Sequence, residues 1–401
     1  MIIAGLMTGT SADALDVVLA EFVFGGHDSS TGTHSDASEL GVRILASREV
    51  EFDQRLRADI LRLLEPGDVP LSLVSSVDGR LGRFSAEAVQ HLCAESGVDC
   101  DLIVSHGQTV RHDISDGVVT STLQIGQPAW IAEATGAPVL SDVRVRDVAA
   151  GGQGAPLVGI LDGLLLGEAE TPTAVLNLGG IANITVMAPD QPPVAFDTGP
   201  ANALIDILAA RLTEGEEGFD RDGRLAAQGR VDEALLTELL ADPYYRLPAP
   251  KSTGKEHFHA DYLDGSLSAR THLGEHDAIA TVTALTARTV ADACRARDVT
   301  RIIASGGGTR NPVLMKRLRS DLGPEITVSS TDEAFGLPEG AKEALLMALL
   351  GWLSWHGLAG TEPNLTGAAH PRIAGRISPG DGPLTLPAPL DAGPTHLRIL
   401  H

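Results

Sequence analysis

Three short segments combine glycine, small hydroxyl residues and carboxylates in a pattern that suits phosphoryl transfer. They read GTSADALD from residue 9, FDTGPANALID from residue 196 and SGGGTRNPVLMKRL from residue 305. In the second segment, Asp197 follows an apolar run and precedes Gly-Pro and a helical pattern. A carboxylate at the carboxyl end of a strand lies in a solvent-filled crevice near helix-terminal N–H groups. The alternative is that Asp197 only caps the helix that follows it.

The first segment has the features of an anion-binding turn. Glycine lets backbone N–H groups approach an anion without a Cβ in the way. Thr8, Thr10 and Ser11 add hydroxyl groups, and Asp13 and Asp16 add carboxylates. The alternative is an ordinary tight hairpin.

The third segment has three consecutive glycines, Gly306, Gly307 and Gly308, before a helical pattern. They leave enough bare backbone for the base or ribose of a nucleotide to lie on it. The alternative is a flexible turn. An anion-binding turn, a strand-end aspartate and a glycine platform, in this chain order, are the parts of one ATP site split between two domains. Together they favour phosphoryl transfer.

Other common catalytic motifs are missing from the sequence. No GxxxxGK[ST] occurs, no lysine precedes Lys251, NLGGIAN lacks the GxGxxG spacing, and no GxSxG is present. His257 and His259 alternate without a third ligand pattern, so we expect no metal site there. His106 directly follows an apolar run, where it either faces a site or is a satisfied core histidine.

Apolar runs that predict strands alternate with longer helical patterns, which indicates an α/β protein. Two strand–turn–strand layouts, one at the N-terminus and one near Leu176, lie about 170 residues apart. This is the layout of a duplicated domain in which each half opens with a β-hairpin. Residues 24–38 are polar and predict a loop, and residues 378–395, rich in Pro, Gly and Asp, predict a loosely attached tail.

Length and composition predict two domains and exclude several partners. The chain of 401 residues is 43% hydrophobic and carries a formal charge of −23, with no run of basic residues that would attract nucleic acid or an anionic membrane. The longest apolar stretch, residues 344–353, is about half a membrane span. The N-terminus predicts a buried strand and not a signal peptide. Cys93, Cys100 and Cys294 show no CxxC spacing, so we expect reduced, mostly buried thiols in a cytoplasmic protein.

The order of these segments resembles the superfamily of actin, sugar kinases and heat-shock ATPases. More narrowly, the chain resembles the anhydro-N-acetylmuramic acid kinase family. This resemblance extends to about Pro379. It rests on MTGTSADALD, SHGQTVRH, LQIGQPAWIAEATGAPVLSDVRVRDVAAGGQGAPLV, LNLGGIANIT, FDTGPANALID, FDRDGRLAAQGRV, PKSTGKEHF and GAKEALLMALLGWL.

The resemblance implies a two-domain actin-like ATPase (ribonuclease-H-like) α/β fold with the active site in the interdomain cleft. Residues 1–130 with about 365–401 would form a first domain that carries the phosphate-binding hairpin. Residues 131–364 would form a second domain with the catalytic aspartate and the adenosine motif. The resemblance further implies ATP and Mg²⁺ as cofactors, a cytoplasmic location and a homodimer. The reaction would phosphorylate 1,6-anhydro-N-acetylmuramic acid and open its anhydro bridge, giving N-acetylmuramic acid 6-phosphate for cell-wall recycling.

The resemblance also assigns roles to residues of this sequence. Asp197 would be the general base and Glu343 would lie near the metal or reacting centre, unless it is a solvated helix-face glutamate. Asp13 and Asp197 would lie near Mg²⁺. The sugar would contact His106, Gln108, Arg146, Asp147, Gly152, Gln153 and Asn202. The nucleotide would contact Gly9, Thr10, Ser11, Ala12, Asp13, Ala14, Leu15, Asp16, Gly179, Gly180, Asn183, Gly306, Gly307 and Gly308.

The substrate's lactyl carboxylate requires a local cation in a protein this acidic. The candidates are Arg144, Arg146, Lys251 and Lys255, with Arg146 first because a guanidinium binds a carboxylate in bidentate fashion. A salt bridge is the alternative role of each, and for the lysines the better one.

Some positions depart from the family pattern. Thr8 stands where the family has Ser, and Ala14 and Ala201 stand where it has Gly. GILDGLLLG replaces a Pro and a nearby His after APLV, and residues 380–401 extend beyond the family's usual end. These departures bear on substrate preference.

Three other functions remain open on the sequence. The chain could phosphorylate another anhydro-sugar such as levoglucosan, or an ordinary amino sugar. It could be an ATP-gated binding or scaffolding protein, although the tail leaves no room for the extra peptide-binding domain of a chaperone. It could also hydrolyse polyphosphate or a nucleotide, because fold alone does not decide function.

Overall fold

The computed structural model describes residues 1–9, 12–25, 38–65, 67–115, 118–167, 169–189, 191–249, 251–254, 257–270, 272–338 and 340–400. The chain forms two compact units, residues 1–167 with 335–401, and residues 168–334. These bounds differ from the expected ones, since 131–167 and 335–364 belong to the first unit. The reason is pairing and packing: β7 (Val139–Ser141) continues the first sheet, and α12 (Ala341–Trp355) packs on it.

The first unit is built on a seven-stranded sheet with the order β13-β7-β4-β1-β2-β3-β14. Its first three strands, β1 (Ile2–Thr8), β2 (Ala14–Phe24) and β3 (Glu39–Glu51), pair antiparallel. β4 (Leu102–Ser105) lies parallel to β1, and β7 lies parallel to β4. A separate two-stranded sheet is formed by β5 (Gln108–Ser115) and β6 (Val118–Ile125).

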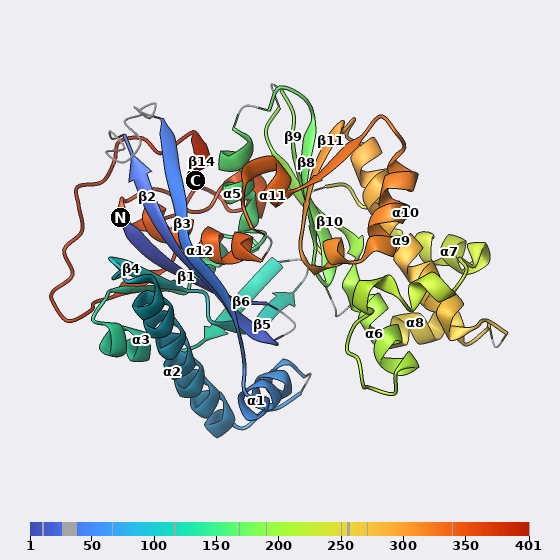
Figure 1. Ribbon diagram of the computed structural model, residues 1–401, viewed down its shortest axis with the longest axis horizontal. Coiled ribbons are helices and arrows are strands. Elements are labelled where there is room, and N and C mark those ends of the chain that lie inside the picture. The colour runs from blue at the N-terminus through green and yellow to red at the C-terminus, as the bar shows by residue number, and fades with distance from the viewer. Residues whose placement is uncertain are drawn as a thin grey trace. The chain divides into compact units, whose positions relative to one another are not determined.

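Helices cover both faces of the first sheet (Figure 1). Because successive strand residues point to opposite faces, Ile3 and Val104 pack with α12 and α5 (Val158–Leu166). Ala4 and Ile103 pack on the other face, with α1 (Gln54–Leu64), α2 (Leu71–Ser96) and α3 (Pro128–Thr135). The unit also contains α4 (Val145–Ala149) and α13 (Pro363–Thr366).

The sequence predicted a loosely attached C-terminal tail, but the structure shows a tail that is held at both edges of the first sheet. β13 (Arg376–Ser378) pairs antiparallel with β7, and β14 (His396–Leu400) pairs in parallel with β3 at the other edge of the sheet. The proline-rich segment between them is anchored as well, because the amide of Leu390 donates to the carbonyl of His356 at 3.0 Å. The extension beyond residue 380 therefore completes the first sheet.

The second unit repeats the core of the first. Its sheet has the order β10-β9-β8-β11-β12. β8 (Thr173–Leu178), β9 (Ile181–Met187) and β10 (Val194–Pro200) are antiparallel, and β11 (Arg301–Ser305) and β12 (Thr327–Ser330) continue in parallel. The order matches β3-β2-β1-β4-β7 of the first unit, so the predicted duplication is confirmed. Two such sheets in one chain are the α/β actin-like ATPase fold that we expected.

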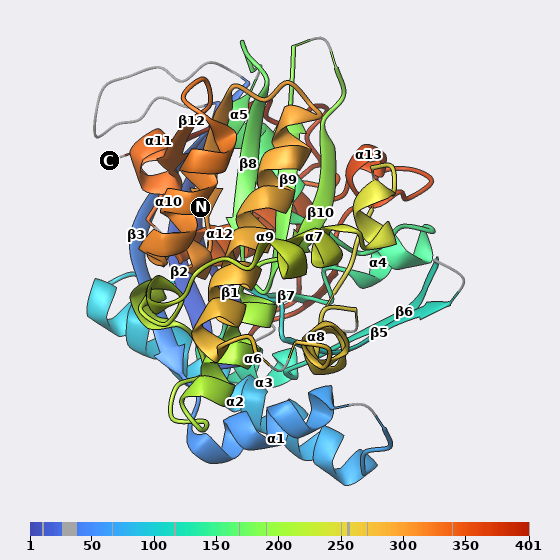
Figure 2. The same ribbon diagram turned by 90° about the vertical axis from the view of Figure 1, so that its right-hand side faces the viewer.

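Helices of the second unit gather on one face of its sheet and beyond it (Figure 2). α9 (Glu275–Arg295) and α10 (Pro312–Leu322) pack against Ala174, Leu176 and Ile302. α6 (Asn202–Leu212), α7 (Glu233–Leu240) and α8 (Ala260–Leu267) form a second cluster with α9. The remaining elements are α11 (Thr331–Phe335) and the 3-10 turns η1 (Arg221–Gly223), η2 (Ala226–Gln228), η3 (Pro243–Arg246) and η4 (Gly307–Arg310).

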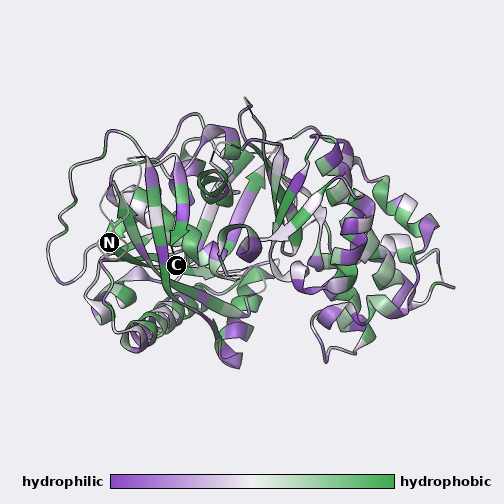
Figure 3. Cartoon of the chain, turned by 45° about the horizontal axis from the view of Figure 1, so that its top comes forward, coloured by the Kyte–Doolittle hydropathy of each residue, from purple (hydrophilic) through white to green (hydrophobic). Residues whose placement is uncertain are grey.

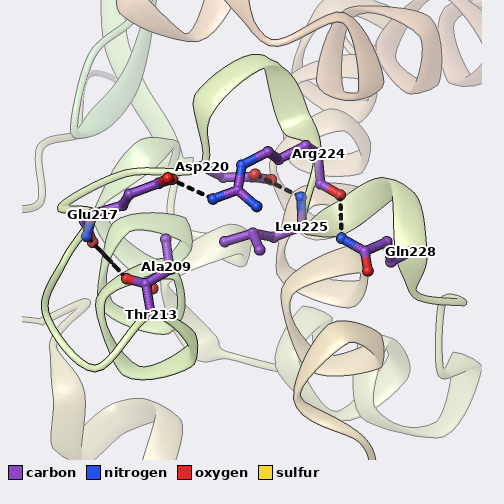
Figure 4. A network of polar contacts seen from close by, with 7 residues as sticks. All are labelled: Ala209, Thr213, Glu217, Asp220, Arg224, Leu225 and Gln228. Carbon is purple, nitrogen blue, oxygen red and sulfur yellow. Dashed lines mark hydrogen bonds and ion pairs between the residues drawn. The ribbon is translucent and has the colours of Figure 1, made fainter.

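The FDRDGRLAAQGRV segment is held by its own polar contacts (Figure 4). The buried carboxylate of Asp220 accepts the amide hydrogens of Leu225 at 2.8 Å and Ala226 at 3.1 Å. Arg224 pairs with Glu217 at 2.5 Å. Asp220 of this motif therefore has a structural role, because its carboxylate accepts hydrogen bonds from nearby backbone amides.

Hydropathy follows this architecture. Figure 3 shows hydrophobic residues along the strands of the first unit, and hydrophobic and hydrophilic residues mixed on the helices of the second. α12 carries the longest apolar run and is 15 residues long, almost all buried. In the described part of the chain, no helix is long and apolar enough to cross a bilayer.

Candidate active site

Asp197 lies within β10 and is held there by three contacts from one neighbouring segment. The amide of Thr253 donates to Oδ2 of Asp197 at 2.8 Å. The amide of Asp197 donates to the carbonyl of Lys251 at 3.0 Å, and the hydroxyl of Tyr244 donates to the carbonyl of Asp197 at 2.7 Å. The residue at the N-cap of α6 is Ala201, with no side-chain cap. Asp197 is therefore not the cap of that helix.

A row of polar residues crosses the second sheet at the level of Asp197. In the strand register, Asp197 lies opposite Asn183, Asn183 opposite Asn177, and Asn177 opposite Ser305. Their neighbours in each strand, such as Leu176 and Phe196, pack in the core with α9 and α10. Because side chains alternate along a strand, the row lies on the sheet face away from those helices.

Lys251 lies close to Asp197 but is engaged by other groups. Its ammonium donates to the carbonyls of Tyr244 at 3.0 Å and Tyr245 at 3.3 Å, and lies 4.5 Å from the centre of the Tyr244 ring. Burial lowers the pKa of Lys251, and the negative charge of Asp197 opposes that shift. Burial and the same charge raise the pKa of Tyr244. Lys251 is thus held near Asp197 by backbone carbonyls and an aromatic ring, and within the described residues it forms no ion pair.

The glycine platform forms in the second unit. The amides of Ala201 and Asn202, at the start of α6, donate to the carbonyls of Gly180 at 2.9 Å and Gly179 at 3.0 Å. A Cβ on Gly308 would lie 2.7 Å from Cβ of Leu178 and 3.3 Å from Oδ1 of Asn202.

The first glycine of the platform has a backbone that favours glycine. Gly306 has a φ of 90°, which L side chains rarely adopt. Around Gly307 a Cβ would meet no atom within 4 Å, so open space lies above it. The predicted nucleotide residues Gly179, Gly180 and Gly306–Gly308 therefore come together, with Asn202 among them. We had expected Asn202 at the sugar.

In the first unit, the buried His106 pairs with the half-buried Arg144. Nε of Arg144 donates to Nε2 of His106 at 2.8 Å, and the other ring nitrogen contacts the carbonyl of Gly107 at 2.5 Å. The hydrogen is therefore on Nδ1. Burial, with the charge of Arg144, lowers the pKa of His106 to about 3. His106 is 2% exposed, and it orients Arg144.

Arg144 connects this pair to the predicted sugar segment. Its Nη1 donates to the carbonyl of Gly154 at 2.7 Å. Asp147, which is fully buried, accepts the amide of Gly154 at 2.7 Å and the hydroxyl of Thr366 at 2.6 Å. A Cβ on Gly152 would meet the carboxylate of Asp147 at 2.3 Å. Asp147 therefore holds the 150–154 loop, and its two oxygens already bond protein groups.

Three other predicted sugar residues differ in exposure. Arg146 is exposed, and within the described residues it takes part in no ion pair. Gln153 is half-buried, and its backbone amide donates to the carbonyl of Thr366 at 2.8 Å. Gln108 is 2% exposed, and among the described residues its Oε1 has no hydrogen-bond donor.

Glu343 lies in the first turn of α12. Burial raises the pKa of Glu343, while the charges of Arg144 and Lys342 oppose the shift. Glu343 is half-buried, so it is not fully solvated on the face of the helix. Its neighbour Lys342 forms a buried ion pair with Asp162 of α5 at 2.7 Å, and Asp162 belongs to the GILDGLLLG departure.

The N-terminal hairpin is partly visible. Thr10 and Ser11 lie outside the described residues. Of the others, Gly9, Ala14 and Asp16 are half-buried, and Ala12 and Leu15 are buried. Asp13 is exposed, and its Oδ1 accepts Nε and Nη2 of Arg57 at 2.9 and 2.5 Å. Asp13 is thus occupied by an ion pair. The methyl group of Ala201 packs in the core of the second unit.

Several residues near the candidate site residues were not expected from the sequence. Thr253 and Tyr244 hold Asp197, Asn177 extends its polar row, and Thr366 holds Asp147. The only available signal for Thr253 was the string PKSTGKEHF, of which we used only the lysines. In the described part of the chain, no group of three or more His, Cys, Asp or Glu side chains forms a metal cluster.

Comparison with known proteins decides the family. Residues 1–380 match the family described as anhydro-N-acetylmuramic acid kinase. The chain belongs to this family. The kinase of that name from Streptomyces coelicolor is 49% identical over 404 residues, covering 100% of this chain and 99% of the relative. The kinase from Streptomyces avermitilis is 50% identical, covering 100% of both chains. The kinase from Rhodococcus erythropolis is 44% identical, covering 100% and 99%.

Membership of the anhydro-N-acetylmuramic acid kinase family makes this chain a phosphotransferase. The family match ends where the extension was expected, at residue 380. Among solved structures, a ROK family glucokinase from Streptomyces griseus in complex with glucose and AMPPNP is 13% identical with a TM-score of 0.33, covering 87% of this chain and 99% of that one. Component A of (R)-2-hydroxyglutaryl-CoA dehydratase from Acidaminococcus fermentans is 13% identical with a TM-score of 0.42, covering 87% and 96%.

Proposed function

We propose that this enzyme transfers the γ-phosphoryl group of ATP to O6 of 1,6-anhydro-N-acetylmuramic acid and adds water at C1. The products are ADP and N-acetylmuramic acid 6-phosphate. Family membership supports the substrate. The observation that carries the chemistry is the carboxylate of Asp197, which the amide of Thr253 holds by one oxygen at 2.8 Å. A carboxylate with a fixed direction is what a general base requires.

The anhydro bridge explains why a base must act on water. In an ordinary sugar kinase the base removes a proton from the sugar hydroxyl, but O6 of this substrate is bonded to C1 and carries no proton. Water attacks C1 and gives one proton to Asp197, and the C1–O6 bond breaks. The released O6 attacks the γ-phosphorus, and ADP leaves. Every bond broken is matched by one formed, and no oxidant or reductant is needed.

We assign the nucleotide's base and ribose to the glycine platform of the second unit. Gly179 and Gly307 expose backbone without a Cβ, and Gly307 faces open space. Gly180, Asn183, Gly306 and Gly308 complete the set in the second unit. In the first unit, the family resemblance assigns residues 9–16 to the phosphates, and of these Thr10 and Ser11 lie outside the described residues. Backbone amides in such turns bind phosphate oxygens.

Magnesium is proposed as the cofactor. Mg²⁺ binds one or two carboxylates together with substrate phosphates and water, so it does not need a large protein cluster. Asp197 is a half-exposed carboxylate and fits this role. Asp13 is exposed, and its Oδ2 is available for this role while Oδ1 accepts from Arg57. When bound, the ion offsets charge on the β- and γ-phosphates.

The sugar is assigned to the network of the first unit. Arg146 offers a guanidinium for the lactyl carboxylate, and Arg144 is oriented by His106 and Gly154. The Oε1 of Gln108, which has no donor among the described residues, can accept a hydrogen bond from a sugar hydroxyl or amide. Gly152 and Gln153 shape the loop beside them, with Asp147 beneath. The positive charge of Arg144 acts on the carboxylate of Glu343. This interaction supports a place for Glu343 near the reacting centre.

The test is coupled ADP release with Mg-ATP. The sugars offered are 1,6-anhydro-N-acetylmuramic acid, levoglucosan and N-acetylglucosamine, alongside a sample without sugar. We expect turnover with the first sugar alone, and a product that mass spectrometry shows to have gained both phosphate and water. Turnover of another sugar would move the assignment to the rival kinase. ADP release without sugar would overturn the acceptor.

Two further assignments follow from the family. ATP is the donor, so we propose that the enzyme acts in the cytoplasm, where ATP is present. We also propose a homodimer, and light scattering after size-exclusion chromatography measures its mass.

A further inference from the structure

Two cysteines of the first unit form a close pair that the proposed reaction does not use. Sγ of Cys93 lies 3.4 Å from Sγ of Cys100. Both residues are half-buried, whereas Cys294 is buried. Our expectation of mostly buried thiols is therefore wrong for this pair. A chain reversal at the end of a helix brings the two sulfurs together, which no CxxC spacing would reveal.

The local fold fixes this approach. Cys93 lies in the last turn of α2, and Gly97 ends the helix with a φ of 66°. The amides of Gly97 and Val98 both donate to the carbonyl of Cys93, so the chain turns back at once, as helices that end in a left-handed glycine do.

The other side of the reversal is anchored too. The amide of Asp101 donates to the carbonyl of Ile2 at 2.8 Å, and its Oδ2 accepts the amide of Ile2 at 2.7 Å. Cys93, Val98 and Cys100 pack at the rim of the core between the sheet and α2. Both sulfurs are thus placed by backbone hydrogen bonds on either side of the turn.

The two thiols differ chemically. A hydrogen bond from Cys100 lowers the pKa of Cys93, against the effects of burial and of Asp99. The same hydrogen bond and burial raise the pKa of Cys100. The thiolate is the nucleophilic form of cysteine, so Cys93 is the sulfur that reacts first and Cys100 holds the proton.

We propose that Cys93 and Cys100 form a reversible oxidation site that takes hydrogen peroxide as its oxidant. The Cys93 thiolate attacks one peroxide oxygen, the O–O bond breaks, and Cys93 becomes a sulfenic acid while hydroxide leaves and takes up a proton as water. Cys100 then attacks the Cys93 sulfur, its proton leaves with the sulfenic oxygen as a second water, and the disulfide forms. Two electrons pass from the two thiols to the peroxide.

The distance allows this bond. A disulfide needs sulfurs about 2.05 Å apart, so the pair must close by about 1.4 Å, which side-chain rotation with small backbone adjustment can supply. The bond would tie the end of α2 to the start of β4, which leads to His106. Oxidation should therefore slow amide hydrogen exchange across residues 97–101.

Cys294 is a matched control within the same chain. It is fully buried in the second unit, and burial raises its pKa to about 12. It should stay reduced under conditions that oxidise the pair.

The experiment treats the reduced full-length protein with hydrogen peroxide and measures free thiols and linked peptides. We expect two of the three thiols to be lost, one intramolecular Cys93–Cys100 bond in the peptide map, and full reversal by dithiothreitol. Cys100→Ser should stop at a sulfenic acid that dimedone captures. Cys93→Ser should oxidise roughly tenfold more slowly. The peptide map of the unmodified chain gives the answer even where a variant fails to fold.

A second measurement tests the pairing without an oxidant. Phenylarsine oxide bridges two adjacent thiols, so it should bind once per wild-type chain and be lost from Cys93→Ser and Cys100→Ser alike. Retention of all three thiols in peroxide, a disulfide that joins two chains, or equal oxidation rates of Cys93→Ser and wild type would each overturn the proposal.

Discussion

The amide of Thr253 and the carboxylate of Asp197 are joined by a hydrogen bond of 2.8 Å between segments 56 residues apart in the chain. The backbone amide and carbonyl of Asp197 are also hydrogen-bonded, to Lys251 and Tyr244. The carboxylate therefore has a defined direction before any ligand binds. A preorganised base needs little rearrangement during the reaction.

Replacing Asp197 with Asn keeps the shape of the side chain but removes the base. Because Asn cannot accept the water proton, we expect kcat to fall by about 10²- to 10⁴-fold, with little change in KM for ATP. Steady-state ADP release measures both constants. Asp264→Asn is the matched control, since Asp264 forms an exposed ion pair with Arg211. A D197N enzyme with near wild-type kcat would contradict the assignment.

Replacing Lys251 with Met removes the positive charge beside Asp197. Attraction between ammonium and carboxylate favours the ionised base, so its loss should move the acidic limb of the kcat–pH profile to higher pH by about one unit. Lys251→Arg keeps the charge and should keep the limb in place. If both variants shifted the limb equally, the effect would be one of packing against Tyr244 and not of charge.

His106 should remain neutral throughout the working pH range, because its pKa is lowered to about 3. The nitrogen shifts of the ring in NMR should show the Nδ1–H tautomer and no titration between about pH 5 and 8. The unfolded chain binds this proton more tightly than the folded one. Stability is therefore complete above the ordinary pKa of about 6.5 and is lost as the pH falls toward 3, by about 1.4 kcal/mol per pH unit.

His106→Gln tests the sign of this effect. Gln has a side-chain oxygen that can still accept from Arg144, but it has no proton to gain. Urea unfolding at several pH values should show a shallower acid loss for the variant. An equal loss would mean that folding does not lower the pKa of His106, and a steeper loss in the variant would mean that folding raises it.

Much of the fold was predictable because strand endings are local in sequence. The hairpins near Leu6 and Leu176 identified the duplication, and both sheets have it. The domain bounds were not predictable, because α12 packs on the first sheet although more than 300 residues separate it from β1 in the sequence. Nor was β14, whose pairing partner is at the opposite end of the sequence.

The residues of the candidate site also differ in how far the sequence predicts them. The sequence singled out the glycines and Asp197 because each lies in a short motif of adjacent residues, but Asp197 lies within β10 and not at the end of the strand as expected, since the strand continues to Pro200. The clamp of Tyr244 and Thr253, and the contact of Arg144 with His106, depend on how distant segments pack. Asp147 illustrates the converse, because its position in a motif suggested a ligand contact and its carboxylate bonds Gly154 and Thr366.

The ion pair of Lys342 with Asp162 should matter for stability more than for chemistry. Both side chains are almost fully buried, so Asp162→Asn leaves an uncompensated ammonium and should cost about 3–5 kcal/mol of unfolding free energy. Urea unfolding measures it. The double variant D162L/K342M should recover most of the loss. Glu39→Gln, which breaks the more exposed pair with Arg398, should cost about 1 kcal/mol or less.

Arg146 should determine recognition of the acidic sugar. Removing the guanidinium in Arg146→Ala deletes a charge-assisted hydrogen bond to the lactyl carboxylate, so KM for 1,6-anhydro-N-acetylmuramic acid should rise by about 10- to 100-fold. Arg146→Lys should recover only part of this, because an ammonium cannot bind a carboxylate as a planar fork. The KM for ATP supplies the control, since it should be the same in wild type and R146A. An unchanged KM for the acidic sugar would assign its carboxylate to another cation, with Arg144 next to be tested.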